Sequence, residues 1–306
     1  MLKGHSLSRK SKIGIIAPAS CEKIKTIKNI INNFSSLGFN LKLGKHIYDN
    51  RGFFAGSDKD RASDIMDMFL DSSIDGIICL RGGYGSIRTI PYLNKDIIIN
   101  NPKFFCGYSD ITILLNYFSS LGLITFHGPM INSNFNDKIT HDNFLNIISY
   151  NKKNFTYDLN DYNHISYYNK RSFSGIVAGG NLAVICSAIG TPWQINMDNS
   201  ILLLEEVNEY PYALHRMLNQ LINCNLLKKC SGIIIGYLSN TANYNNSNEK
   251  KILEQTIVEI LSPLNIPLLV GFPSGHNYPN LTIPIGSSAT FISDSNLFIF
   301  NDNFLN

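Results

Sequence analysis

Residues 104–118 read FFCGYSDITILLNYF: an apolar run, a short polar turn and then a helix-like pattern. Four apolar residues after the turn share one helical face, at i, i+3, i+4 and i+7: Ile111, Leu114, Leu115 and Phe118. The turn therefore places Ser109 between a strand and a helix, as in the nucleophile elbow G-x-S-x-G. Gly107 fills the first glycine position, but Ile111 stands at the second. Ser109 is either a nucleophile on a variant elbow or an ordinary helix N-cap.

The alternation of strand and helix extends along the whole N-terminal half. Five apolar runs are typical of buried strands: KIGIIAP (12–18), FNLKLG (39–44), IDGIICL (74–80), KFFCGYS (103–109) and LITFHGP (123–129). Three segments between them have helical periodicity: KIKTIKNIINNFSSLG (23–38), DKDRASDIMDMFLDS (58–72) and DITILLNYFSSLG (110–122). This order predicts a parallel sheet with helices on both faces, which binds ligands at the carboxyl ends of its strands.

The second half of the chain has a different character. Residues 151–171 are rich in Asn, Tyr and Asp without a sustained period, which indicates a connection. Beyond them, strand-like and helix-like segments mix, and closely spaced strands are expected near the end. A length of 306 residues suits two domains. We expect an N-terminal α/β domain over 1–150, a connector over 151–171 and a C-terminal mixed α/β domain over 172–306.

Composition excludes several classes of protein. The chain is 44% hydrophobic with a mean hydropathy of -0.01, and no apolar stretch predicts a membrane span. A net charge of +3 from scattered basic residues gives no reason to expect nucleic acid. Six cysteines without a C-x-x-C pair fit reduced thiols in the cytoplasm. No two histidines have metal-ligand spacing, so we expect neither a metal nor a cofactor.

A glycine-rich segment, LRGGYGS (80–86), follows the strand-like IDGIIC. Glycines at the end of a strand let the backbone approach a ligand closely, either around a phosphate or as an oxyanion donor. The segment lacks the Lys-Ser/Thr of a P-loop and the spacing of a dinucleotide fingerprint. A tight turn that binds nothing is the other interpretation.

An acidic pair ends another strand, in ILLLEEVNEYPYALHRML (201–218). Glu205 and Glu206 follow four apolar residues, and Pro211 then opens a helix. A carboxylate at the end of a buried strand costs free energy unless it is paired. At least one of the two glutamates should therefore have a specific partner.

The segment GFPSGHNYPNLTIPIG (271–286) contains His276 in a loop rich in Gly and Pro. An imidazole in such a loop can serve as a base, although a lone loop histidine is more often a polar surface residue. Together the candidates run Ser, acid, His along the chain, the order of the α/β-hydrolases.

Eight segments carry a resemblance to the LD-carboxypeptidases of serine peptidase family S66, in particular to the muramoyltetrapeptide carboxypeptidase branch. They stand in the order and spacing of that family: IAPAS (16–20), RGGYG (81–85), CGYSD (106–110), ITFHGPM (124–130), AGGNLAV (178–184), IGTPW (189–193), LLLEEVNEYPYALHRML (202–218) and GHNYPNLTIPIG (275–286). The resemblance implies that the elbow here does not require its second glycine.

The same resemblance assigns roles to residues. It implies Ser109 as nucleophile, Glu205 as the acid of the triad and His276 as the base. The oxyanion hole falls on the backbone N–H groups of Asp110 and Gly83. The implied fold is a flavodoxin-like parallel-sheet domain that carries the serine and a mixed α/β domain with a β-rich end that carries Glu and His.

The implied activity is that of a cytoplasmic serine carboxypeptidase. It would hydrolyse the L,D-peptide bond of murein tetrapeptides and release terminal D-alanine during peptidoglycan recycling. Arg81 and Arg88 are candidates for reading the terminal carboxylate. A homodimer is one candidate assembly. Two alternatives stay open: an immunity-type peptidase that cleaves peptidyl- or aminoacyl-nucleotide antibiotics, and a binding protein without catalysis that uses RGGYG as a cradle.

Overall fold

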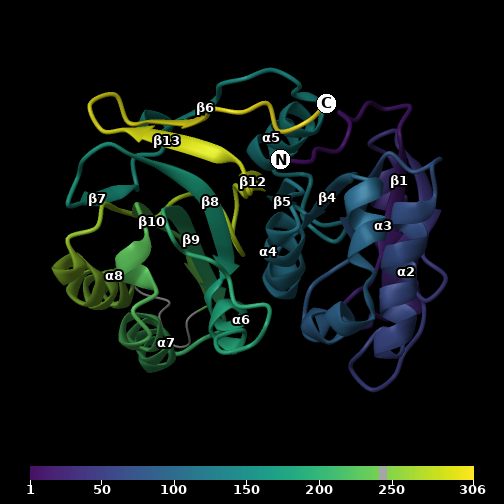
Figure 1. Cartoon of the computed structure of the whole chain (residues 1–306), viewed down its shortest axis with the longest axis horizontal. Coiled ribbons are helices and arrows are strands. Elements are labelled where there is room, and N and C mark those ends of the chain that lie inside the picture. Colours follow the sequence, from purple (N-terminus) through teal and green to yellow (C-terminus); the bar gives the residue numbers. More distant parts are fainter. Residues whose placement is uncertain (241–246) are drawn as a thin grey trace. The chain divides into compact units, whose positions relative to one another are not determined.

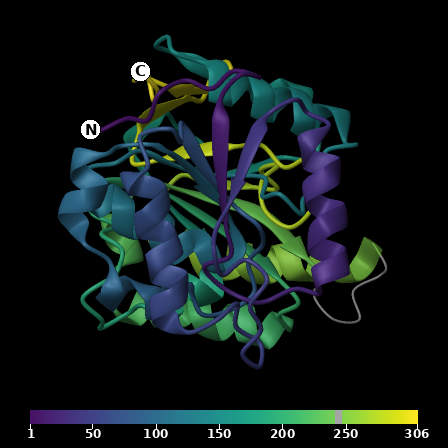
Figure 2. The same cartoon turned by 90° about the vertical axis from the view of Figure 1, so that its right-hand side faces the viewer.

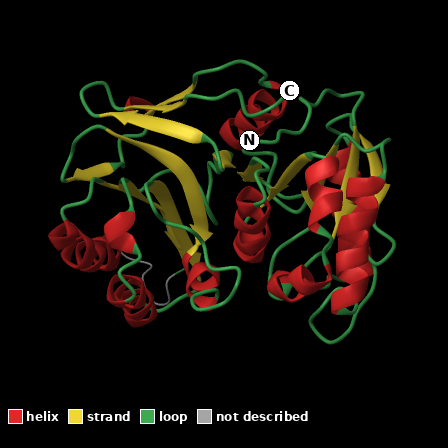
Figure 3. Cartoon of the chain, in the orientation of Figure 1, coloured by secondary structure: helices red, strands yellow, loops and turns green. Residues whose placement is uncertain are grey.

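The computed structural model describes residues 1–240 and 247–306. The chain divides into two compact units. The first comprises Met1–Lys152, Leu281–Gly286 and Asn303–Asn306, and the second comprises Lys153–Asn280 and Ser287–Asp302. Each unit is built around its own β-sheet (Figures 1 and 3).

The sheet of the first unit has six strands among the described residues, in the order β12-β5-β4-β3-β1-β2. Their bounds are β1 (Lys12–Ile16), β2 (Asn40–Leu43), β3 (Gly76–Cys79), β4 (Phe104–Gly107), β5 (Thr125–His127) and β12 (Ile283–Ile285). β1 to β5 are parallel, and β12 pairs antiparallel with β5. The parallel order 2-1-3-4-5 is flavodoxin-like, as expected, and ligands bind such sheets at the carboxyl ends near the β1/β3 switch point.

Helices cover both faces of this sheet (Figure 2). Their bounds are α1 (Ile24–Ser35), α2 (Asp58–Leu70), α3 (Lys95–Asn100), α4 (Thr112–Ser120) and α5 (Lys138–Ser149), with short 3-10 helices η1 (Ser86–Tyr92) and η2 (Ser109–Ile111). Successive side chains of β4 point to opposite faces. Phe104 meets Phe144 of α5, whereas Phe105 packs against Phe69 of α2 and Phe118 of α4. This double burial explains why the strand is apolar throughout.

The sheet of the second unit has eight strands in the described part of the chain, in the order β6-β14-β13-β8-β9-β10-β11-β7. Their bounds are β6 (Phe155–Asp158), β7 (Ser166–Tyr168), β8 (Phe173–Asn181), β9 (Ser200–Val207), β10 (Gly232–Ser239), β11 (Leu268–Val270), β13 (Ser288–Ile292) and β14 (Leu297–Phe300). β8 to β11 are parallel, and the outer strands pair antiparallel. This mixed sheet with a β-rich end confirms the second half of the expected fold.

Three helices pack on one face of the second sheet (Figure 1). They are α6 (Leu182–Ser187), α7 (Pro211–Asn223) and α8 (Ser247–Leu261), and the unit also has 3-10 helices η3 (Leu159–Asp161), η4 (Leu227–Lys229) and η5 (Ser262–Leu264). Leu202 and Leu204 of β9 belong to the core beneath these helices. Because side chains alternate along a strand, Leu203 and Glu205 must face the other side.

Residues 151–171, expected as a connector, contribute strands to the second sheet. β6 and β7 are its two edge strands. An edge strand is partly exposed and often polar, so an Asn- and Tyr-rich segment can form one without an apolar run. The chain end also differs from expectation, because 281–286 and 303–306 belong to the first unit and not to a domain spanning 172–306.

Most of the thiols are buried. Cys79, Cys106, Cys186 and Cys230 are buried, whereas Cys21 is half-buried and Cys224 is exposed. Burial raises the pKa of the Cys186 thiol to about 12 and that of Cys230 to about 11. No helix within residues 1–240 and 247–306 has both the length and the apolar character that crossing a bilayer demands.

Candidate active site

Ser109 follows β4 and has a backbone φ of 65°. Nine non-glycine residues of the described chain have positive φ, and the other eight are all Asn. Asn tolerates this left-handed region, whereas Ser adopts it only where the surrounding structure imposes it, often at a functional site. The N-cap of η2 is Tyr108 and that of α4 is Ile111. Ser109 is therefore not a helix N-cap, and it has the strained backbone of a nucleophile elbow.

The missing second glycine of the elbow has a steric explanation. A Cβ on Gly107 would lie 2.9 Å from a side-chain carbon of Ile111. The Ile111 side chain thus fills the space that a side chain at position 107 would need, so only one of the two residues can be large. Because Gly107 is the small partner, the turn accepts an isoleucine where the usual motif has glycine.

The glycine-rich segment after β3 lies directly against this turn. A Cβ on Gly82 would come within 2.7 Å of the Ser109 Cβ, and one on Gly83 within 2.3 Å of the Ser20 Oγ. Gly83 also has a φ of 117°, which favours glycine. Ser20 accepts a hydrogen bond from the Tyr84 N–H at 3.0 Å. Because glycine is required at positions 82 and 83, the backbone of this segment can lie close to Ser109. Our sequence prediction named Gly83 and missed Gly82.

The two adjacent glutamates of β9 have different partners. Glu206 accepts hydrogen bonds from the Asn181 side chain at 2.8 Å and the Ala183 N–H at 2.7 Å, and its burial raises its pKa. It therefore holds the start of α6. Glu205 points to the opposite face of the strand, where its Oε2 lies 2.6 Å from Nδ1 of His276. Both carboxylates thus have the specific partners that burial requires.

The loop after β11 brings His276 to Glu205. The Glu205 side chain is fully buried and that of His276 is 16% exposed. A carboxylate at Nδ1 favours the tautomer with the proton on that nitrogen, which makes Nε2 the basic one. Gly275 has a φ of 119°, and a Cβ there would lie 2.8 Å from the Glu205 Oε2. The buried Asn280 accepts the Gly275 N–H at 3.0 Å, so it supports the loop. The sequence prediction did not include these last two residues.

Comparison with known proteins places the chain in a family. The family model for the LD-carboxypeptidase N-terminal domain matches residues 13–128, and the model for the LD-carboxypeptidase C-terminal domain matches residues 174–291. The chain belongs to the LD-carboxypeptidase family, S66. The predicted nucleophile lies in the first matched region, and Glu205 and His276 lie in the second.

Relatives of this LD-carboxypeptidase family member carry two kinds of name. A probable murein peptide carboxypeptidase of Bacillus subtilis is 31% identical over 293 residues, covering 94% of this chain and 90% of that protein. The microcin C7 self-immunity protein MccF of Escherichia coli is 27% identical, covering 88% and 86%. A solved structure of wild-type MccF in its apo state matches with a TM-score of 0.89 at 25% identity over 100% of both chains. The muramoyltetrapeptide carboxypeptidase of Oxalobacter formigenes matches with a TM-score of 0.79 at 26% identity, covering 95% and 99%.

The structure brings together some of the predicted site residues. Glu205 and His276 are hydrogen-bonded within the second unit. Ser109, Asp110 and Gly83 belong to the first unit, where the segment containing Gly83 packs on the Ser109 turn. The pairing of Ser109 with His276 stays a prediction.

Both arginines that were candidates for reading a substrate carboxylate are paired with carboxylates of the protein. Arg81 donates to Glu22 at 2.5 Å. Arg88 donates through Nε and Nη2 to Asp58, and the shortest of these contacts is 2.8 Å. A guanidinium has five N–H donors, so these pairings do not exclude either arginine from binding a substrate carboxylate. The assignment of this role to one of the two stays a prediction.

One cluster of possible metal ligands occurs in the first unit, away from the predicted triad residues in sequence. Ligand atoms of His46, Asp49 and Asp60 lie within 4.8 Å of one another. His46 Nδ1, however, is 2.7 Å from Asp49 Oδ2, and Asp60 accepts the Ser57 N–H in the capping box of α2. The hydrogen bond with Asp49 raises the pKa of His46. The contact of His46 with Asp49 and the capping-box hydrogen bonds of Asp60 thus give all three side chains a role within the fold.

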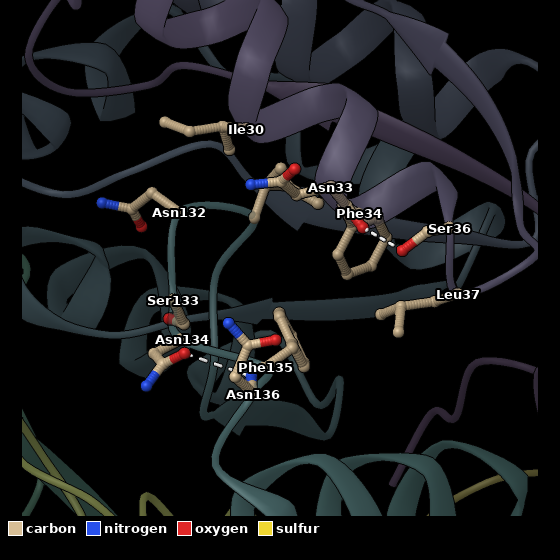
Figure 4. Close-up of a pocket in the computed structure, with 11 residues that line it drawn as sticks. Ile30, Asn33, Phe34, Ser36, Leu37, Asn132, Ser133, Asn134, Phe135 and Asn136 are labelled. Carbon is tan, nitrogen blue, oxygen red and sulfur yellow. Dashed lines mark hydrogen bonds between the residues drawn. The ribbon is translucent and has the colours of Figure 1, made fainter.

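A cavity of about 390 Å³ lies between the end of α1 and residues 131–136 (Figure 4). Amides such as Asn33 and Asn132 line it together with the rings of Phe34 and Phe135. Its lining contains no charged side chain and none of the predicted site residues. We therefore assign this cavity no part in the reaction.

Proposed function

We propose that the protein is a serine carboxypeptidase that releases terminal D-alanine from murein tetrapeptides by hydrolysis of the L,D-peptide bond. In this proposal it acts in the cytoplasm during peptidoglycan recycling. The observation that carries the proposal is the hydrogen bond of 2.6 Å between the buried Glu205 and His276, in a chain of the LD-carboxypeptidase family. The names of the Bacillus and Oxalobacter relatives support the choice of substrate.

The proposed reaction has two halves. In acylation, Nε2 of His276 takes the proton of the Ser109 hydroxyl while Oγ attacks the carbonyl of the L-configured residue. The imidazolium then protonates the amine of D-alanine, the C–N bond breaks, and an ester remains on Ser109. In deacylation, His276 takes a proton from water, the resulting hydroxide attacks the ester, and the tripeptide leaves as Ser109 regains its proton. Glu205 stabilises the imidazolium in both halves.

Two backbone donors are proposed to bind the oxyanion, the N–H groups of Asp110 and Gly83. Within residues 1–240 and 247–306, neither group donates to another protein atom. Asp110 N also lies 3.4 Å from the position a Cβ on Gly82 would take, so the glycine segment runs close to it. Loss of one such donor typically lowers the rate by about 10² to 10³-fold.

Mass spectrometry of peptide products tests the proposal. The protein is incubated with a tetrapeptide whose terminal D-alanine is L,D-linked and, separately, with a pentapeptide whose terminal D-alanine is D,D-linked. We expect loss of one alanine from the L,D-linked peptide alone. The His276→Ala protein is the control and should produce no tripeptide above the rate without enzyme. Cleavage of the D,D-linked peptide instead would contradict the assignment.

A second candidate function follows from the similarity to MccF. Solved structures of MccF include complexes with glutamyl sulfamoyl guanosine and with adenosine monophosphate. In this chain, the exposed rings of Tyr210 and Tyr212 stack with their centroids 5.5 Å apart. A nucleobase can stack on an aromatic surface of this kind. A competition assay between the tetrapeptide and an aminoacyl sulfamoyl nucleoside decides between the two. We expect the tetrapeptide to have the higher kcat/KM.

A further inference from the structure

A buried carboxyl group adjoins the proposed nucleophile without taking part in the steps above. Asp110, the residue after Ser109, is 4% exposed. Its Oδ2 accepts the Ser86 N–H at 2.7 Å. The Ser86 hydroxyl in turn donates to the Asp110 carbonyl oxygen at 2.5 Å. Two hydrogen bonds thus tie the end of the glycine-rich segment to the Ser109 turn.

A buried guanidinium holds the same segment from another direction. Arg61 of α2 is 1% exposed, and its Nη1 donates to the carbonyl oxygens of Gly85 and Pro18, each at 2.7 Å. Its Nη2 also pairs with Asp58. Pro18 lies in the loop after β1, so Arg61 connects that loop with the segment after β3. These are the two loops at the switch point of the sheet.

The geometry leaves the glycine-rich segment little freedom. It cannot carry a side chain at Gly82 without meeting Ser109, so it already lies at contact distance from the nucleophile. The hydrogen bonds to Asp110 and Arg61 oppose any movement away. The spacing between the Gly83 and Asp110 N–H groups is therefore set by side chains that do not themselves touch the oxyanion.

Burying the charges of Asp110 and Arg61 costs folding free energy, which indicates that the two side chains have a specific role. Burial disfavours the charged carboxylate of Asp110 and raises its pKa, while Arg61 and the N–H donors act in the opposite sense. A carboxyl group offers two acceptor oxygens at this position, whereas an amide offers one oxygen and adds two donors.

We propose that the side chains of Asp110 and Arg61 are positioning groups, which fix the two backbone donors of the oxyanion hole relative to each other. This inference rests on the proposed serine mechanism. Misplacement of a donor by about 1 Å can lower the rate by about 10²-fold. The effect should fall on kcat, because the donors act on the transition state, and KM should change little.

The test compares Asp110→Asn with a matched control, Asp64→Asn. Asp64 is also buried, at 3% exposed, and its carboxylate accepts the backbone N–H groups of Lys45 and His46, at 3.0 Å each. Each protein is titrated with a fluorophosphonate to count reactive Ser109, and kcat is expressed per labelled site, which removes any unfolded fraction. We expect Asp110→Asn to lose about 10²-fold in kcat and in labelling rate, and Asp64→Asn to stay within about twofold of the unmodified protein.

The outcomes separate the two proposals. An unmodified protein that neither labels at Ser109 nor releases D-alanine overturns the proposed function and this inference together. An active protein in which both variants keep the same kcat per site, or lose it equally, overturns the inference alone. Should Asp110→Asn fail to fold, Arg61→Lys takes its place, because it keeps the charge and replaces the planar guanidinium that holds Gly85 and Pro18 by a single ammonium group. A loss of about 3 to 10-fold in kcat per site would then support the inference, and an unchanged kcat would contradict it.

Discussion

Replacing Glu205 by Gln keeps the shape of the side chain and removes its charge. The carboxylate is fully buried and 2.6 Å from His276 Nδ1, so solvent cannot substitute for it. A charge-assisted hydrogen bond contributes about 1.5 to 3 kcal/mol against about 0.5 to 1.5 for a neutral one. The lost charge alone therefore lowers kcat by about tenfold, since 1.36 kcal/mol of barrier is one factor of ten.

The tautomer of His276 adds a larger loss. The glutamine amide can turn its NH₂ toward Nδ1, which then accepts, so that the proton moves to Nε2 and the base is lost. In the Ser-His-Asp proteases, the corresponding change of Asp to Asn lowers kcat by about 10⁴-fold. We therefore expect Glu205→Gln to lower kcat by about 10³ to 10⁴-fold with little change in KM.

The assay is release of D-alanine from the L,D-linked tetrapeptide, with kcat expressed per fluorophosphonate-labelled site. Glu206→Gln is the matched control, because Glu206 adjoins Glu205 in β9 but binds Asn181 and the start of α6. It should lower the stability of the fold and leave kcat per site nearly unchanged. A loss of less than tenfold in Glu205→Gln, or an equal loss in Glu206→Gln, would refute the role given to Glu205.

Three further predictions follow from the described geometry. Gly275→Ala should lower kcat by more than tenfold, because an added Cβ strains a φ of 119° and contacts the glutamate that orients the imidazole; unchanged kinetics would contradict this. Iodoacetamide at pH 8 should modify the exposed Cys224 well before Cys106, whose pKa burial raises, as peptide mapping will show. An NMR titration should give His46 a pKa above 6.5. The ion pair with Asp49 then stabilises the fold fully below pH 6.5, and this stabilisation is lost as the pH rises through the folded-state pKa. Asp49→Asn should lower the titration midpoint of His46.

Four strands of the parallel sheet, β1, β3, β4 and β5, could be predicted because they are buried on both faces. β1 to β5 coincide with the five apolar runs. The edge strands β6 and β7 could not be predicted in this way, since partial exposure permits polar residues there. β12 escaped assignment to the first unit for another reason: it joins β5, more than a hundred residues away in sequence, and no local pattern encodes such a contact.

Some residues of the candidate site could be predicted from the sequence and others could not. The residue types and order of Ser109, Glu205 and His276 were visible in the sequence, and alternation along β9 accounts for why Glu205 and not Glu206 faces the histidine. Arg61 gave no signal, because an arginine in the polar-looking DKDRASD is normally at the surface. Its burial, at 1% exposed, arises from carbonyl groups of two distant loops.

The most direct test of the account is a single-turnover reaction quenched in acid and followed by peptide mapping. The unmodified protein is mixed with the L,D-linked tetrapeptide and sampled over milliseconds to seconds. We predict a transient ester on the peptide that contains Ser109, with the mass of the tripeptidyl group, and a complete loss of both adduct and D-alanine release in Ser109→Ala. Release of D-alanine by Ser109→Ala at an undiminished rate would contradict the account.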